Sequence, residues 1–180
     1  MITIKAFWQK VQTQLKANNP VILAMVMEKK GSAPRGVGAH MFILSDGSTV
    51  DTIGGGPLEY LAIQEAKQNI KNGKSIVQTF SLNNATAGEY GMVCGGQLTV
   101  ALYCLQKKDL VQVEKALTLI NTKNKIVLSL GWQNENFDFK VYDLAESFAL
   151  KEKLTKKSLL QMDTTNQSGQ YLEIMKQSPR

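Results

Sequence analysis

The chain has 180 residues, 43% hydrophobic and 20% charged, which is typical of a soluble globular protein that is large enough to bury a core. Its formal net charge of +6 suggests an anionic partner. The lysine clusters after Lys107, however, are of the kind that usually forms solvated faces, and they lack the interleaved aromatic residues of a nucleic-acid platform. Two cysteines and one histidine argue against a disulfide framework and a structural zinc site. We find no signal peptide and no apolar run of bilayer length, so we expect a cytoplasmic protein that binds neither nucleic acid nor membrane.

The first half of the chain is predicted to alternate helices and strands. Apolar residues at helical spacing predict an amphipathic helix over residues ~3–17, which Asn18-Asn19-Pro20 ends. The continuous apolar run Val21–Met27 is typical of a strand buried on both faces. A loop over 31–38 follows, and then strands Ala39–Leu44 and Thr49–Ile53 are joined by a hairpin turn. A helix to Asn72 comes next, with Gly73 as its left-handed C-cap, and strand Ser75–Leu82 follows it.

The second half continues the alternation with a weaker signal after Leu144. A polar loop over Asn83–Gly91 is followed by a strand that Met92 opens and Leu105 ends. Asp109 is predicted to cap a helix over ~110–122, with Val113, Leu117 and Ile120 on one face. Further strands are predicted over 126–132, 137–142 and 171–175, the last after a polar stretch over 163–169. We therefore predict an α/β or α+β fold, a single layered domain over residues 1–180 with a mixed β-sheet flanked by helices.

Three consecutive glycines, Gly54, Gly55 and Gly56, lie where the third predicted strand leads into a helix. Without Cβ atoms the backbone can adopt positive φ and approach a ligand closely, and free amides at a helix N-terminus attract anions. Pro57 suits the first helical turn because the N–H that it lacks would have no partner there. The stretch is neither a P-loop nor a Gly-x-Gly-x-x-Gly fingerprint, so an anion site and a tight packing turn both remain open.

Two other glycine-rich loops also adjoin predicted strands. The first carries Ser32 and Arg35, and the other carries Cys94, Gly95 and Gly96. If the sheet places these loops and the triple glycine at one edge, they form a single pocket, which is where α/β folds bind ligands.

The side chains in these loops each have a functional and a structural interpretation. Arg35 can hold a phosphate or carboxylate in a two-pronged contact, or it can be a surface arginine. Glu59 can serve the site or cap its helix. The Cys94 thiol can be a nucleophile of low pKa, in an enzyme that acts on a small phosphorylated substrate, or a small core residue. For His40 and Cys104 we predict structural roles.

Taken in order, these motifs resemble the XdhC/CoxI family, the accessory proteins of molybdenum hydroxylases such as xanthine dehydrogenase and carbon monoxide dehydrogenase. The matching motifs are Gly31–Arg35 with Gly38–Met41, Ile53–Glu59, and Gly91–Gly96. The resemblance is to the family's N-terminal domain, with its core over residues 5–105 and a helix–strand extension over 106–175. The tail over 176–180 resembles the linker that leads, in longer members, into a Rossmann domain.

This resemblance implies an accessory protein, not a turnover enzyme, that carries molybdenum cofactor as molybdopterin or its dinucleotide form. The protein would hold the cofactor, help in its sulfuration and insert it into an apo molybdenum hydroxylase of the xanthine dehydrogenase type, with a sulfurase as a further partner. A homodimer is compatible with this role.

The resemblance also implies a set of binding residues and no catalytic residue. The phosphate would contact Arg35 and the amides of Gly55, Gly56 and Leu58, and the Cys94 thiol would lie near the molybdenum, for which sulfur is a suitable ligand. The full implied set is Ser32, Arg35, Gly54, Gly55, Gly56, Glu59, Cys94, Gly95 and Gly96.

Overall fold

The computed structural model describes residues 2–31, 36–81, 96–122 and 125–175. The chain divides into two compact units, one over residues 20–105 and the other over residues 1–19 and 106–180. We call them the central unit and the split unit, and each is described by itself. Helices and antiparallel sheets occur together, which confirms the predicted α/β class.

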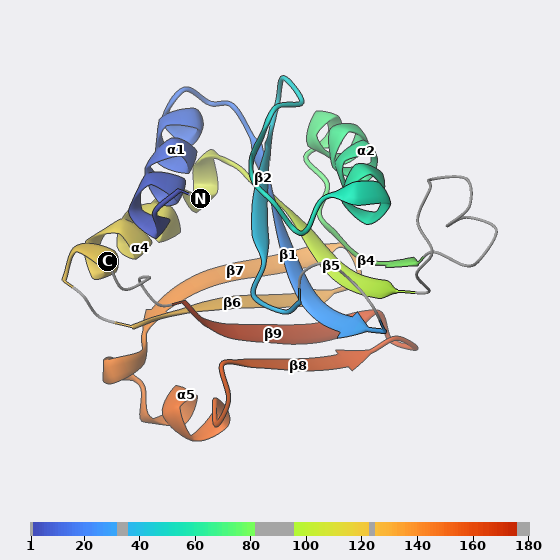
Figure 1. Ribbon diagram of the computed structural model, residues 1–180. Coiled ribbons are helices and arrows are strands. Elements are labelled where there is room, and N and C mark those ends of the chain that lie inside the picture. Colours follow the sequence, from blue (N-terminus) through green and yellow to red (C-terminus); the bar gives the residue numbers. More distant parts are fainter. Residues whose placement is uncertain (1, 32–35, 82–95, 123–124, 176–180) are drawn as a thin grey trace. The chain divides into compact units, whose positions relative to one another are not determined.

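The central unit contains a five-stranded sheet in the order β3-β2-β1-β5-β4 and one long helix (Figure 1). Its elements are β1 (Val21–Lys30), β2 (His40–Leu44), β3 (Thr49–Asp51), α2 (Gly56–Asn72), β4 (Ile76–Ser81) and β5 (Gln97–Leu105). Every neighbouring pair of strands is antiparallel, so the mixed sheet expected from the sequence is replaced by a sheet of hairpins and antiparallel crossovers.

Strand β1 lies at the centre of this sheet, between β2 and β5. All of its residues from Val21 to Met27 are buried, as the continuous apolar run predicts. One face of the sheet packs against α2 through Ala62, Ala66 and Ile70, which share a core cluster with β1 side chains such as Ile22 and Ala24. Burial of this apolar surface stabilises the unit by roughly 25 cal/mol per Å².

Helix α2 ends as the sequence predicts, because Gly73 adopts a left-handed φ of 64° and its neighbour Lys74 donates its N–H to the Asn69 carbonyl. The Asn69 side chain is a less favourable feature of this helix. It is 7% exposed, and its Nδ2 group has no hydrogen-bond partner in the described part of the chain. A buried amide without a partner loses its hydration and gains nothing in return.

We therefore expect Asn69→Leu to raise the free energy of unfolding by about 1 kcal/mol, because it removes an unsatisfied donor at similar side-chain volume. Urea denaturation measures the change, and Asn72→Leu at the exposed end of the same helix is the control. A loss of stability in Asn69→Leu that Asn72→Leu does not share would contradict this interpretation.

The split unit contains a four-stranded antiparallel sheet in the order β7-β6-β9-β8. Its helices are α1 (Ile4–Lys16), α4 (Leu110–Asn121) and α5 (Phe148–Lys153), with short 3₁₀ turns η1 (Lys107–Asp109) and η2 (Leu144–Glu146). Its strands are β6 (Ile126–Gln133), β7 (Asn136–Asp143), β8 (Ser158–Asp163) and β9 (Ser168–Met175).

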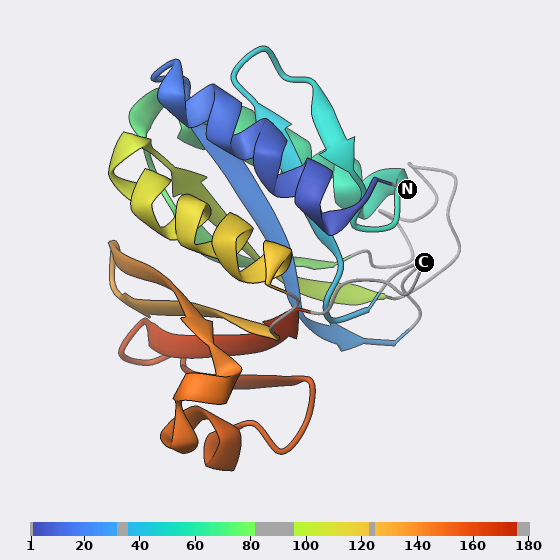
Figure 2. The ribbon, with the colours of Figure 1, turned by 90° about the vertical axis from the view of Figure 1, so that its left-hand side faces the viewer.

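Helices cover both faces of this second sheet (Figure 2). On one face, the buried Trp8 of α1 stacks on Phe139 at 6.4 Å and donates its indole N–H to the Met175 sulfur at 3.4 Å. On the same face, Gln112 of α4 accepts a hydrogen bond from the β7 backbone. The opposite face holds a smaller cluster, in which Leu150 and Leu154 pack on β6 and β9 side chains.

The sequence misplaced or missed several elements. Strand β5 begins at Gln97, whereas the strand was expected to open at Met92, and residues 82–95 with their expected polar loop lie outside the described residues. Helix α5 and strand β8 were not predicted, because neither shows a clean periodicity: no residue of α5 is fully buried and β8 is a half-exposed edge strand. Asp109 begins α4 as predicted, but its carboxylate accepts from the Gln106 N–H and not from the helix itself.

Candidate functional site

The triple glycine connects β3 to α2, and all three residues have positive φ: 128° at Gly54, 73° at Gly55 and 69° at Gly56. Side chains with a Cβ adopt such angles only at a cost, so three in succession require glycine. Pro57 lies in the first turn of α2, and Gly55 is the N-cap without any side-chain cap of its own. The backbone conformation between β3 and α2 therefore requires glycine at Gly54, Gly55 and Gly56.

Glu59 closes this loop from the first turn of α2. Its Oε2 atom accepts three hydrogen bonds: from the Thr52 hydroxyl at 2.5 Å, the Ile53 N–H at 3.1 Å and the Gly55 N–H at 2.7 Å. Thr52 Oγ1 in turn accepts the Gly54 N–H at 2.9 Å. Of the two roles that the sequence leaves open for Glu59, these contacts correspond to the capping role.

This arrangement changes which amides can meet a ligand. The Gly55 N–H is already used by Glu59, whereas the sequence suggested it as part of an anion anchor. In the described residues, the N–H groups of Gly56 and Leu58 make no hydrogen bond. A Cβ built at Gly55 would meet nothing within 4 Å, so the surface of the loop is open to an approaching molecule.

The strand registers place the strand ends that flank the three glycine-rich loops at one end of the central sheet. Strand β1 ends there and β5 begins there, since Lys30 pairs with Gln97; β3 runs parallel to β1 and ends at the same side. These strand ends are staggered, however. Asp51 lies level with Ala24, and Gln97 lies level with Lys30, six positions along β1, which corresponds to roughly 20 Å of extended strand. The loops themselves would have to span that distance to form one pocket.

The structure describes only some of the other predicted site residues. Ser32, Arg35, Cys94 and Gly95 lie outside the described residues. Gly96 is buried directly before β5, and Cys104 is 1% exposed in the core of the central unit, as predicted for a structural cysteine. In the described part of the chain, no group of three or more His, Cys, Asp or Glu residues could hold a metal ion.

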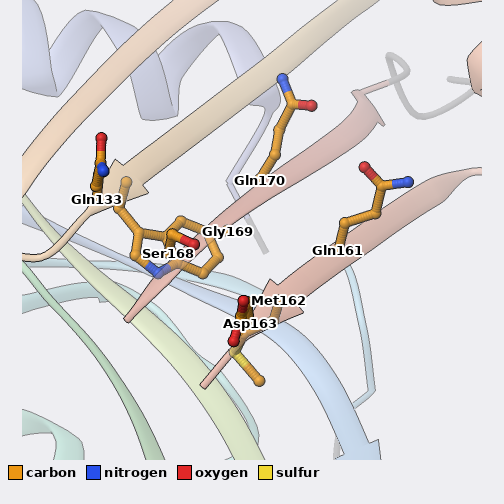
Figure 3. A pocket seen from close by; sticks show the side chains of 8 residues that line it. Gln133, Gln161, Met162, Asp163, Ser168, Gly169 and Gln170 are labelled. Carbon is orange, nitrogen blue, oxygen red and sulfur yellow. The ribbon is translucent and has the colours of Figure 1, made fainter. Parts of the chain in front are cut away.

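The split unit has a hollow of about 610 Å³ at one end of its sheet, which the sequence did not indicate (Figure 3). It lies where β6 and β8 end and β9 begins. Its lining residues are Trp132, Gln133, Gln161, Met162, Asp163, Ser168, Gly169 and Gln170. Asp163 supplies the only charge among them, and its oxygens already accept hydrogen bonds from Asn166 and Thr165, which lower the pKa of its carboxyl group. A hollow lined by amides and a carboxylate is unsuited to an anionic ligand.

Gly169 lets a large ring lie against its strand beside the hollow. Trp132 packs over Gly169 so closely that a Cβ at position 169 would lie 2.3 Å from its ring. Trp132 also stacks on Phe137 at 6.3 Å, and it is 8% exposed. With its ring held in this way, Trp132 forms a wall of the hollow.

Comparison with known proteins matches the first part of the chain to one family. Residues 14–81 match the model of the XdhC and CoxI family. This confirms the predicted resemblance over a segment that includes the first loop and the triple glycine. The third loop, at residues 91–96, lies beyond the matched segment.

Two individual proteins are also similar. An 83-residue stretch is 35% identical to the uncharacterized protein YqeB of Escherichia coli strain K12, covering 46% of this chain and 15% of YqeB. A crystal structure of a xanthine dehydrogenase from Bacillus halodurans matches 93% of this chain and 52% of its own, with a TM-score of 0.65 and 16% identity, and this likeness shows the fold alone. The chain thus spans about half of the solved relative and a smaller part of the curated one. None of the helices that the structure describes is long and apolar enough to cross a membrane.

Proposed function

Since residues 14–81 relate this chain to the XdhC and CoxI family, we propose that it is an accessory protein that carries molybdenum cofactor to a molybdenum hydroxylase. In this proposal the cofactor, as molybdopterin or its dinucleotide form, is cargo and not a resident group. The protein holds it during sulfuration, with a sulfurase as partner, and passes it to an apoenzyme of the xanthine dehydrogenase type. It performs no turnover chemistry of its own.

The observation that carries the proposal is the glycine loop before α2. It lies inside the segment that matches the family, its three positive φ angles expose backbone and not side chains, and space is open in front of Gly55. The N–H group of Gly56, an exposed residue, is available at the positive end of the helix dipole, whereas Leu58 is 2% exposed and belongs to the core. Such a surface suits the phosphate of molybdopterin.

Glu59 has a supporting role in this site. Its carboxylate accepts hydrogen bonds from Thr52, Ile53 and Gly55, so it holds the loop in the conformation that leaves the Gly56 amide open. Arg35 is proposed to neutralise the phosphate from the first loop, and Cys94 is proposed to contact the molybdenum from the third. Ser32, Gly95 and Gly96 complete the proposed set.

The test is direct binding. We expect the protein to retain molybdenum cofactor through gel filtration, with pterin fluorescence and molybdenum eluting together with the chain. Arg35→Ala should lower the affinity about tenfold, because it removes a charge-assisted contact to phosphate. Lys30→Ala is the matched control, since Lys30 is an exposed cation at the end of the strand that leads into the same loop.

The two cysteines provide a second comparison. Cys94→Ala should weaken retention and Cys104→Ala should not, because Cys104 lies in the core. Equal effects of the two would mean that the thiols act through folding. If the wild-type protein retains no more cofactor than a heat-denatured sample, the proposed function is wrong.

A further inference from the structure

The net charge of the protein belongs entirely to the split unit. Residues 1–19 and 106–180 carry 15 Lys and Arg against 9 Asp and Glu, whereas residues 20–105 carry 6 against 6. The charge of +6 is therefore a property of one unit, and within that unit it is concentrated. Four lysines fall within seven residues, at Lys151, Lys153, Lys156 and Lys157, with Glu152 as the only acid among them.

These lysines follow a helix that also exposes an aromatic residue. Helix α5 packs on its sheet through Leu150, and Leu154 continues the contact just after the helix. Phe148 is 75% exposed, the largest exposed fraction among the large hydrophobic side chains of the described residues. Lys151 lies three positions after Phe148, so both side chains project from the same side of the helix. We call Phe148, Lys151, Lys153, Lys156 and Lys157 the basic ridge.

The charges of the basic ridge have no acidic partner among the described residues. All four lysines are exposed, and in the part of the chain that the structure describes none of them forms an ion pair. Lys153 donates a hydrogen bond to the side-chain oxygen of Gln170 at 2.8 Å, which is a neutral partner.

The same hydrogen bond joins the basic ridge to the hollow at the end of the sheet. Gln170 lines that hollow, and Gln161 lies directly opposite it on β8, so both amides stand beside α5 on one face of the sheet. Figure 3 shows these two side chains pointing the same way from their strands. Lys153 therefore adjoins the recess of about 610 Å³, whereas Lys156 and Lys157 directly precede β8 and lie toward its other end.

We propose that the basic ridge and this hollow form a docking surface for an acidic face of a partner protein. The lysines attract the acidic face, Phe148 supplies an apolar anchor, and the hollow beside Lys153 accepts an uncharged side chain from the partner. The identity of the partner, an apo molybdenum hydroxylase, rests on the proposed function. The surface lies on the split unit, whereas the proposed cofactor loop lies on the central unit.

A protein suits this surface better than a membrane or a nucleic acid. A six-residue helix with one outward ring is too short to lie stably in a lipid interface. Nucleic acids are bound by repeated aromatic platforms and by arginines, and the ridge has a single ring and only lysines. An isolated ring beside positive charges is typical of a protein hot spot.

The experiment measures binding of the full chain to apo xanthine dehydrogenase prepared without its molybdenum cofactor. The double variant Lys156→Glu/Lys157→Glu should lower the affinity about tenfold at low salt, and less at high salt, because the effect is electrostatic. Phe148→Ala should lower it about fivefold at any salt concentration, without loss of stability, because the ring is solvated in the free protein. The matched control is Lys107→Glu/Lys108→Glu, which reverses the same charges on another exposed pair in the same unit.

Cofactor retention is measured on the same variants, so that the two proposals can fail separately. Docking that depends on Lys156 and Lys157 supports the surface even if the protein retains no cofactor. Equal losses in the two double variants would show that net charge alone matters and would overturn the inference. So would absence of binding to the apoenzyme, or tighter binding to vesicles of phosphatidylcholine and phosphatidylserine than to the apoenzyme.

Discussion

Gly169→Ala is expected to lower the free energy of unfolding by about 3 kcal/mol, the largest effect of any conservative substitution that we predict. The new methyl group would lie 2.3 Å from Cζ2 of Trp132 and 2.8 Å from the backbone oxygen of Gln161. The ring is fixed by its stacking on Phe137, and the oxygen belongs to the paired strand β8, so neither neighbour can move without breaking other contacts. Urea denaturation with intrinsic tryptophan fluorescence measures the change.

The control lies on the adjacent strand. Gly131 is also extended, it pairs with Gln170 next to Gly169, and a Cβ there would meet nothing within 4 Å. Gly131→Ala should therefore be neutral, or stabilising by about 0.5 kcal/mol, because alanine restricts the unfolded chain. If both substitutions cost the same, the loss comes from the strand backbone and not from the Trp132 contact.

Glu59→Ala is expected to cost about 2–3 kcal/mol and to weaken cofactor retention together with stability. It removes the acceptor of three hydrogen bonds and leaves the Ile53 and Gly55 amides and the Thr52 hydroxyl without a partner in a half-buried loop. Glycines at positive φ have no preference of their own for this conformation, so the loop should become heterogeneous. Hydrogen exchange at Gly55 reports this directly, since its amide loses protection.

Glu65→Ala is the control for this prediction. Glu65 lies on the same helix and, in the described part of the chain, makes no hydrogen bond or ion pair, so its removal should change the free energy of unfolding by less than about 0.5 kcal/mol. Glu59→Gln should fall between the two because it keeps one oxygen acceptor and loses the charge. Unchanged protection of the Gly55 amide in Glu59→Ala would contradict the role that we assign to Glu59.

The parts of the fold that depend on local pattern were predictable from the sequence. The apolar run of β1 predicted a fully buried strand, and the spacing of Val113, Leu117 and Ile120 predicted the buried face of α4. Gly73 predicted the end of α2 because few other residues adopt its left-handed angle. These signals are strong because they arise from the residue itself or from its near neighbours.

Features that depend on distant partners were not predictable. Strand β8 is defined by its pairing with β9, and nothing in Ser158–Asp163 alone distinguishes it from a loop. The hollow beside Gln161 and Gln170 needs the register of three strands, so the residues around Gly169 do not indicate it by themselves. At the glycine loop the sequence indicated the residues, but not that Glu59 would occupy the Gly55 amide.

The contact between Trp8 and Met175 has a consequence for how the chain folds during synthesis. The two residues are 167 positions apart, and both belong to the split unit. The central unit is continuous and has all its strands once residue 105 has left the ribosome, so it can fold first. Helix α1, although it precedes the central unit in the chain, must wait with its apolar face exposed until its partners α4 and β7 have been made. Helix α1 is thus made before the central unit but buried after it, and this interval is when the chain is most exposed to aggregation.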